Sequence, residues 1–132
     1  MRRGVAAVNA EANAVSALLN GGTVRLYDGS QPMAVDDPVT TQTLIAELRF
    51  GSPAFQVAAW GVARAHAIRA CLSAVATGTP TWFRASAADN TPVYDGSVGL
   101  PGTESDLEID HVPIHERARV TIGVAMYRAL AE

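Results

Sequence analysis

The fold is best inferred from residues 79–99, which read TPTWFRASAADNTPVYDGSVG. An aromatic run over residues 81–86 and a β-rich run over residues 93–98 flank a polar turn at residues 88–91. Aromatic and β-branched residues favour strands, whereas Asp, Asn and Gly favour turns. The second run contains Asp95-Gly96, a dipeptide that predicts a tight turn with positive φ. The stretch therefore predicts two strands of one sheet, and it carries no group typical of catalysis.

The first third of the chain predicts one helix and two strands. Apolar residues at helical spacing predict a helix over residues 5–19, which the glycines after Asn20 would end. Residues 23–27 alternate as a strand, and Asp28-Gly29 turns the chain into a polar loop. Residues 44–50 alternate again and predict a half-buried strand. The apolar stripe of the helix consists of Val5, Val8, Ala12, Val15, Leu18 and Leu19.

Residues 58–76 give conflicting signals. The segment is rich in alanine, which has the highest intrinsic helix propensity. Between Val62 and Ile68, however, larger residues alternate with alanines, as they do in a strand. We expect an extended strand over residues 62–68, and a helix is the alternative.

The last third predicts a short strand at residues 107–109 and a long one at residues 117–128. The long strand would present Val120, Ile122, Val124 and Met126 on one face. Burying each of these side chains would contribute about 1.5–3 kcal/mol, so we expect this strand at the centre of a sheet.

Short strands, regular turns and one helix together predict a mainly β fold, an antiparallel β-sandwich of the jelly-roll kind. The length suits one domain over residues 1–132, with a helical segment at 1–20 and a sandwich at 23–128.

Composition narrows the classes of partner. The net charge is −3, and all ten basic residues are arginines. Because no basic cluster is present, we expect no nucleic-acid partner, and we expect the arginines to pair with carboxylates within the chain or across an interface.

Cys71 is the single cysteine and is expected to be a small buried hydrophobe. The apolar run at residues 5–19 is interrupted by polar residues and is too short to span a membrane, so we expect no membrane partner.

The densest acidic run is Asp106, Glu108 and Asp110, which a strand would project from one face. Three carboxylates could hold Ca²⁺, but a flat strand separates alternate residues by roughly 7 Å. We favour a solvated edge that arginines partly neutralise.

His111 and His115 stand four residues apart, which on a helix would suit a zinc ion. Pro113 lies between them and disfavours a helix, so we favour structural roles for both histidines. No nucleophile elbow and no phosphate-binding glycine loop is present in the sequence. We therefore expect no catalytic residue, no cofactor and no metal, with the acidic run and the two histidines as the weak metal candidates.

The aromatic residues could in principle form a sugar-binding platform, but we favour core and contact roles for them. Trp82 and Phe83 are adjacent, so in a strand one would face the core and the other would face outward or toward an interface.

Several short motifs resemble, in order, a family of small virion proteins of tailed bacteriophages. They follow an amphipathic N-terminal helix and are LYDGSQP at residues 26–32, TTQTLIAEL at 40–48, ATGTPTWFR at 76–84 and DGSVG at 95–99. The chain departs from the family pattern in its last third, where an acidic strand replaces a neutral one and His-Glu-Arg follows. The departure affects the surface that would face a partner.

The resemblance implies a non-enzymatic virion protein present in many copies, with a capsid cement or decoration role as the leading expectation. Its partners would be copies of itself and other virion proteins, such as a major capsid, neck or tail protein, and its location the virion. The alternatives are a neck or tail structural protein, or a tail-associated module that binds carbohydrate or a receptor. A third hypothesis, which does not come from the resemblance, is a metal-dependent hydrolase that uses His111, His115 and the acidic run. Edge strands and the N-terminal helix would supply contacts, and the candidate interface residues are Arg25, Arg49, Trp60, Arg117 and Arg119.

Overall fold

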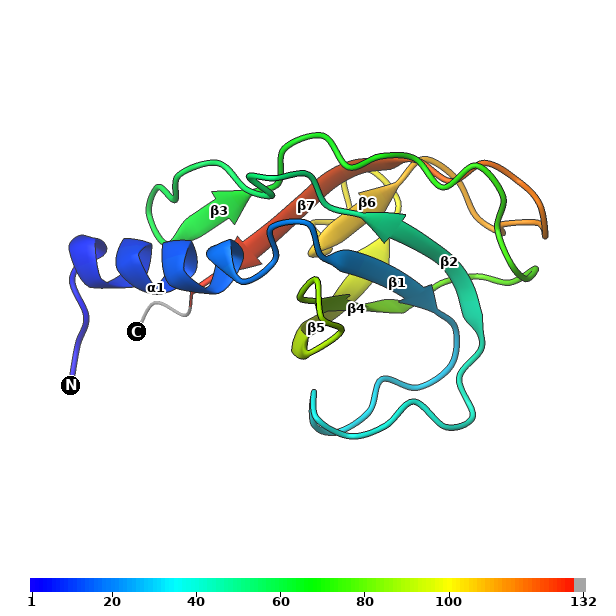
Figure 1. Ribbon diagram of the computed structural model, residues 1–132, viewed down its shortest axis with the longest axis horizontal. Coiled ribbons are helices and arrows are strands. Elements are labelled where there is room, and N and C mark those ends of the chain that lie inside the picture. The colour runs from blue at the N-terminus through cyan, green and yellow to red at the C-terminus, as the bar shows by residue number, and fades with distance from the viewer. Residues whose placement is uncertain (130–132) are drawn as a thin grey trace.

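The computed structural model describes residues 1–129 and contains one helix and seven strands (Figure 1). The prediction of a mainly β chain with one N-terminal helix is confirmed. The elements are α1 (Val5–Ala17), β1 (Thr23–Tyr27), β2 (Leu44–Arg49), β3 (Val62–Arg64), β4 (Trp82–Ser86), β5 (Pro92–Gly99), β6 (Leu107–Ile109) and β7 (Ile122–Arg128).

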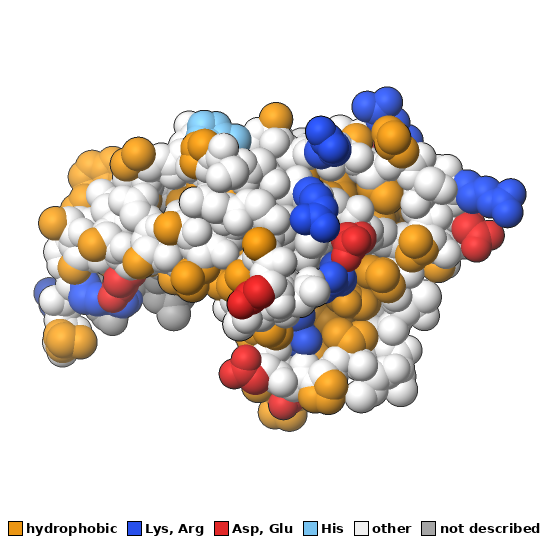
Figure 2. All heavy atoms as spheres, in the orientation of Figure 1, with side chains coloured by type: hydrophobic (Ala, Val, Ile, Leu, Met, Phe, Trp, Pro, Cys, Tyr) orange, Lys and Arg blue, Asp and Glu red, His pale blue; other side chains and the backbone are white. Residues whose placement is uncertain are grey.

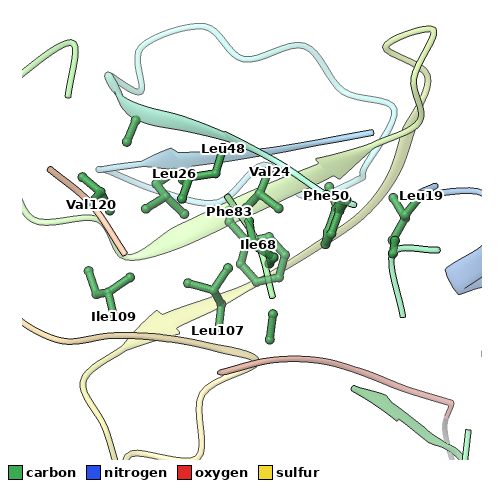
Figure 3. Packing of buried hydrophobic residues seen from close by; sticks show 14 of the residues in the cluster. Leu19, Val24, Leu26, Leu48, Phe50, Ile68, Phe83, Leu107, Ile109 and Val120 are labelled. Atoms are coloured by element: carbon green, nitrogen blue, oxygen red, sulfur yellow. The ribbon is translucent and has the colours of Figure 1, made fainter. Parts of the chain in front are cut away.

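The strands form one curled sheet in the order β2-β1-β4-β5-β6-β7-β3. Side chains from β1, β2 and β4 meet those of β6 across the core, as Val24, Leu26 and Leu107 illustrate in Figure 3. All neighbouring strands are antiparallel except β5 and β6, which are parallel. The prediction of a wholly antiparallel arrangement is therefore wrong at this pair. Two left-handed residues in the connecting loop, Gly102 and Glu104, help to turn the chain back to its former direction.

Both edge strands of the sheet are covered by irregular segments of the same chain. Residues 55–59 bond to the outer edge of β3, since the Gln56 N–H donates to the Arg64 carbonyl oxygen. Residues 69–78 cover β2 and also bond to residues 114–120. Unpaired strand edges invite association with other chains, and these segments remove that route. These segments leave less of either strand edge open for the contacts between copies that we expected edge strands to supply.

Residues 58–76 contain no helix, so the helical alternative does not form; they consist of a tight turn at residues 60–61, the strand β3, isolated bridges and bends. Only β3 is a regular strand, while Ala65, Arg69 and Cys71 make isolated bridges to other segments. The predicted strand over 62–68 is thus right at residues 62–64 but too long. Cys71 is half-buried rather than buried, because its segment lies on the outside of the sheet.

The hairpin predicted from residues 79–99 is present as β4 and β5, but Asp95-Gly96 does not form a turn. Gly96 lies opposite Phe83 in the middle of the pair, and it is absent from the positions with positive φ. A Cβ atom at Gly96 would lie 2.6 Å from Cε1 of Phe83. The glycine is therefore needed for close packing against an aromatic ring and not for backbone freedom.

Strand β4 is buried on both faces, which corrects the expectation that Trp82 or Phe83 faces outward. Both side chains are 1% exposed. Phe83 packs in the core (Figure 3), whereas Trp82 donates a hydrogen bond from Nε1 to the Asp28 carbonyl oxygen. The segment that follows β1 thus covers the second face of β4.

The last strand is shorter than predicted and does not lie at the centre of the sheet. It begins at Ile122 rather than at residue 117, and it lies one strand from the edge, between β6 and β3. Residues 114–120 bond to residues 71–78 instead, because the chain bends before β7 begins.

Helix α1 packs a narrower stripe than its spacing predicts. Val8, Ala12 and Leu19 are buried, but Val5 and Leu18 are 45% and 58% exposed. The buried side of α1 contacts β3 and β7, so only the residues on that line reach the core. The exposed apolar residues remain available at the surface.

Candidate interaction surface

The residues that carry the motif resemblance meet in one cluster around β4. The ring of Tyr27 stacks on that of Trp82 with a centroid separation of 4.6 Å and an interplanar angle of 17°. The Asp28 carboxylate accepts a hydrogen bond from the Thr43 N–H at 2.7 Å, which closes the loop after β1. Burial raises the pKa of Tyr27 above its ordinary value, so this phenol is neutral at physiological pH.

Arg84 and Asp95 form a buried ion pair between β4 and β5. Arg84 Nε lies 2.7 Å from Asp95 Oδ1, and Nη2 lies 3.0 Å from Oδ2. The hydrogen bond to Asp95 holds the pKa of Arg84 above its ordinary value. A third donor, Nη1, bonds to the Asp37 carbonyl oxygen at 2.8 Å and so ties down the loop. These Arg84 donors and Asp95 oxygens therefore all have their partners within the fold.

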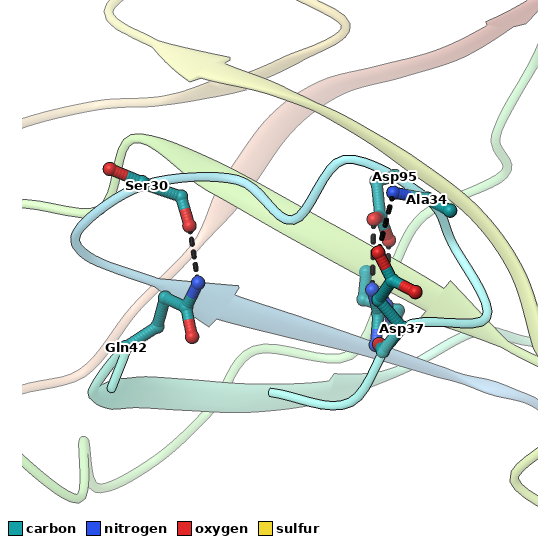
Figure 4. Close-up of polar contacts among 6 residues, drawn as sticks. Ser30, Ala34, Asp37, Gln42 and Asp95 are labelled. Carbon is teal, nitrogen blue, oxygen red and sulfur yellow. Dashed lines mark hydrogen bonds and ion pairs between the residues drawn. The ribbon is translucent and has the colours of Figure 1, made fainter. Parts of the chain in front are cut away.

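The loop over β4 is held by its own polar contacts as well. Gln42 donates to the Ser30 carbonyl oxygen across the loop, and the Asp37 carboxylate accepts from the Ala34 N–H (Figure 4). These hydrogen bonds therefore hold the loop in a defined conformation over β4.

The structure spreads out the candidate metal ligands. Asp106 Oδ2 accepts from the N–H and the hydroxyl of Ser97, and Glu108 is half-buried on β6. His111 Nδ1 lies 2.8 Å from Asp110 Oδ1 at an exposed position, and His115 is exposed as well. Within residues 1–129, no three His, Cys, Asp or Glu side chains are placed to hold a metal ion together.

The candidate interface arginines differ in the hydrogen bonds and ion pairs that they form within the chain. Arg25 is held on β1 by Glu47 at 2.7 Å and by Asn90 at 3.0 Å. Arg49 is exposed and lies opposite Arg69 in an antiparallel bridge. Arg117 and Arg119 are exposed, and no ion pair forms at either in the described part of the chain. Arg25 is thus a structural residue, and Arg49 makes one long hydrogen bond from Nη1 to the Gly21 carbonyl oxygen at 3.5 Å, whereas Arg117 and Arg119 remain open to a partner.

Trp60 is the most unusual of the candidate interface residues. It is 79% exposed and adopts a φ of 53°, and Gly61 follows with a φ of 74°. The Ala59 N–H donates to the Val62 carbonyl oxygen, and the Val62 N–H donates back, both at 3.0 Å. Two positive φ values inside such a hairpin are typical of a type I′ turn, for which Asn-Gly is the favoured pair. A bulky residue at a positive φ is a backbone outlier.

Three asparagine side chains fix the segment that carries this turn. Asn9 and Asn13 on α1 accept hydrogen bonds from the N–H groups of Gly61 and Ala58, at 2.7 and 2.8 Å. Asn20 accepts one from the Ala54 N–H at 2.8 Å. Sequence reasoning missed this role, although two asparagines four residues apart on one helix face were a readable signal.

An apolar hollow lies near the other end of α1. It has a volume of about 380 Å³ and lies between the helix, the β4–β5 hairpin and β7. The molecular surface is indented below α1 in Figure 2. Tyr94 lines the hollow, its hydroxyl oxygen is buried without a hydrogen-bond partner, and burial raises its pKa. The lining residues used below are Val15, Leu18, Asp89, Val93, Tyr94 and Tyr127.

Comparison with protein-family models, with curated proteins and with solved structures found no match to this chain. No helix within residues 1–129 has the length and apolar character needed to cross a membrane. The candidate surface therefore has to be interpreted from its own chemistry.

Proposed function

We propose that this chain is a non-enzymatic structural protein of a tailed-bacteriophage virion that assembles in many copies, as a cement or decoration protein of the capsid. The observation that carries the proposal is the ordered set of motifs that resemble such proteins. Those motifs supply the residues of the cluster around β4, where side chains stack, form an ion pair and hold the loop. Motif residues that hold the fold together are what we expect in a family whose members share a structural scaffold.

The surface supports a role in assembly. Large apolar side chains stand exposed on several segments, and Val57, Trp60 and Leu72 are 84%, 79% and 75% exposed. Exposed apolar groups and arginines without ion pairs are common features of protein contacts. A cement protein would use them against the capsid lattice and against its own neighbours.

Mass spectrometry and cryo-electron microscopy of particles purified from the phage that encodes this chain test the proposal. We expect the chain in the particles at a copy number comparable to that of the capsid lattice. Presence at the neck or tail alone would replace the capsid assignment with a neck or tail role. Absence from purified particles would refute a virion role altogether.

A second candidate is a tail-associated module that binds carbohydrate, and one observation favours it. Trp60 and Arg64 line a surface hollow of about 440 Å³, and exposed aromatic rings with nearby polar groups can stack on sugars. A glycan array separates the two candidates. A cement protein gives no signal, whereas a carbohydrate-binding module gives signals that Trp60→Ala removes.

A further inference from the structure

The turn at Trp60 holds a residue with a strained backbone whose side chain adds little to the stability of the fold. The indole is 79% exposed, so its burial in this chain stabilises little. Its φ of 53° belongs to a region that bulky residues rarely occupy, and Gly or Asn would be less strained there. Strain of this kind is concentrated at functional sites, where the surrounding structure holds it.

The surrounding structure does hold this turn. Asn9 and Asn13 fix the N–H groups of Gly61 and Ala58, on either side of the indole. A Cβ at Gly61 would lie 3.2 Å from Cγ2 of Val8, so the turn also sits close against α1. Trp60 is therefore presented outward on a fixed base, which lowers the entropy cost of binding.

The same chain carries a hollow with matching chemistry. Val15, Leu18, Val93 and Tyr127 give it an apolar lining suited to an aromatic ring. Tyr94 adds an aromatic ring to this lining, and aromatic rings pack favourably against one another. The exposure of Trp60 shows that the hollow is not filled by the Trp60 of the same chain.

The charges beside the two features are opposite. Arg64 lines the surface next to Trp60. Asp89 lies at the rim of the hollow, and within residues 1–129 it forms no ion pair. Opposite charges at the two surfaces favour their approach and set their orientation.

We infer that Trp60 of one copy inserts into the hollow beside Tyr94 of a second copy. Because the inserted residue and the hollow are different surfaces of one chain, the contact is head-to-tail, and repeating it gives a ring or an open filament. This inference rests on the proposed function for the expectation that copies meet. An indole buries about 150–250 Å², well below a standard interface, so we expect association that depends strongly on concentration.

Two variants separate the two halves of the contact. Trp60→Ala removes the inserted side chain and leaves the hollow intact. Leu18→Glu places a charge in the hollow and leaves Trp60 intact, and Leu18 is exposed enough for the fold to accept the change. Leu72→Ala is the matched control, because Leu72 is also a large exposed apolar residue but lies on the segment over β2.

Sedimentation velocity of the purified full chain over a wide concentration range tests the inference, with circular dichroism to verify folding. We expect the unmodified chain and Leu72→Ala to associate, and each of the other two variants alone to stay monomeric. A mixture of Trp60→Ala and Leu18→Glu should form a 1:1 dimer that grows no further, because together they supply one intact indole and one intact hollow. Tryptophan emission should shift to shorter wavelength on association, since Trp82 is already buried and only Trp60 changes environment.

Three results would overturn the inference: a monomeric chain at every concentration, unchanged association of Trp60→Ala, or a mixture that remains monomeric. If Leu18→Glu does not fold, Asp89→Arg at the exposed rim replaces it, and it should weaken association several-fold. These outcomes are independent of the proposed function. A chain that is monomeric in solution yet present in purified particles would refute this contact and keep the virion role.

Discussion

Arg84 and Asp95 face each other across β4 and β5 with two parallel hydrogen bonds, and their side chains are only 8% and 2% exposed. Buried charges are tolerated when geometry and further hydrogen bonds compensate for the loss of water. Here the third Arg84 donor bonds to the Asp37 carbonyl oxygen, so the pair also fixes the loop over β4. One ion pair thus joins two strands and a loop far away in sequence.

Replacing one partner of this pair should be severely destabilising. Arg84→Met leaves Asp95 buried without a counter-charge, which typically costs about 3–5 kcal/mol of the free energy of unfolding. Urea denaturation measures the loss. The matched control is Arg25→Met, which removes the half-exposed pair with Glu47 and should cost no more than about 1 kcal/mol. Equal losses in the two variants would contradict the structural role assigned to the buried pair.

Substituting Gly96 tests whether the glycine is needed for close packing or for backbone freedom. In Gly96→Ala the new methyl group meets the ring of Phe83, which is 1% exposed and has little room to move. We expect a loss of about 1–3 kcal/mol in thermal or urea unfolding, as is usual for overpacking. Gly123→Ala is the control, because its nearest neighbour to an added Cβ is the Glu108 oxygen at 3.8 Å. If both variants unfold alike, the ring contact is not the reason for the glycine.

The asparagines of α1 act as acceptors, which predicts a difference between two substitutions. Asn13→Ala removes the acceptor for the Ala58 N–H and should cost about 1 kcal/mol. Asn13→Asp keeps an oxygen in a similar place and should retain most of that stability. Hydrogen exchange at the Ala58 amide is the direct measurement, with fast exchange expected only in the alanine variant. Equal protection in both variants would show that the side chain does not hold this segment.

The parts of the fold that were predicted correctly depend on local patterns. Residues 23–27 and 44–49 alternate and are followed by turn residues, so β1 and β2 could be located from neighbours in sequence. The burial of Trp82 could not, because it depends on the loop after Asp28 folding back over β4. The same holds for Ile45, which is fully buried although its strand pattern places it outward. Its cover comes from the segment around Val75, thirty residues away along the chain.

The candidate site was only partly visible in the sequence for a similar reason. Trp60 stands out as a tryptophan in an alanine-rich segment, and it was predicted as an interface residue. Its left-handed backbone was hidden, because type I′ turns are recognised by Asn-Gly and here the pair is Trp-Gly. The hollow beside Tyr94 combines α1, the β4–β5 hairpin and β7, so no single stretch of sequence shows it.

Trp60→Asn should make the isolated chain more stable. Asn tolerates a positive φ far better than Trp, so the strain at a φ of 53° is relieved, and little burial is lost because the indole is exposed. We expect a gain of about 1 kcal/mol in the free energy of unfolding, obtained from urea denaturation at a protein concentration where the chain is monomeric. Trp60→Val is the matched control, since it also removes the indole but its β-branched side chain keeps the strain, and it should bring no gain.

The two variants together decide why a tryptophan occupies this turn. If Trp60→Asn stabilises the fold and Trp60→Val does not, the natural residue is held at the expense of stability, as expected for a residue that serves a contact. If Trp60→Asn instead destabilises the monomer, the indole contributes to this chain's own fold. The strain would then not be evidence for a binding role.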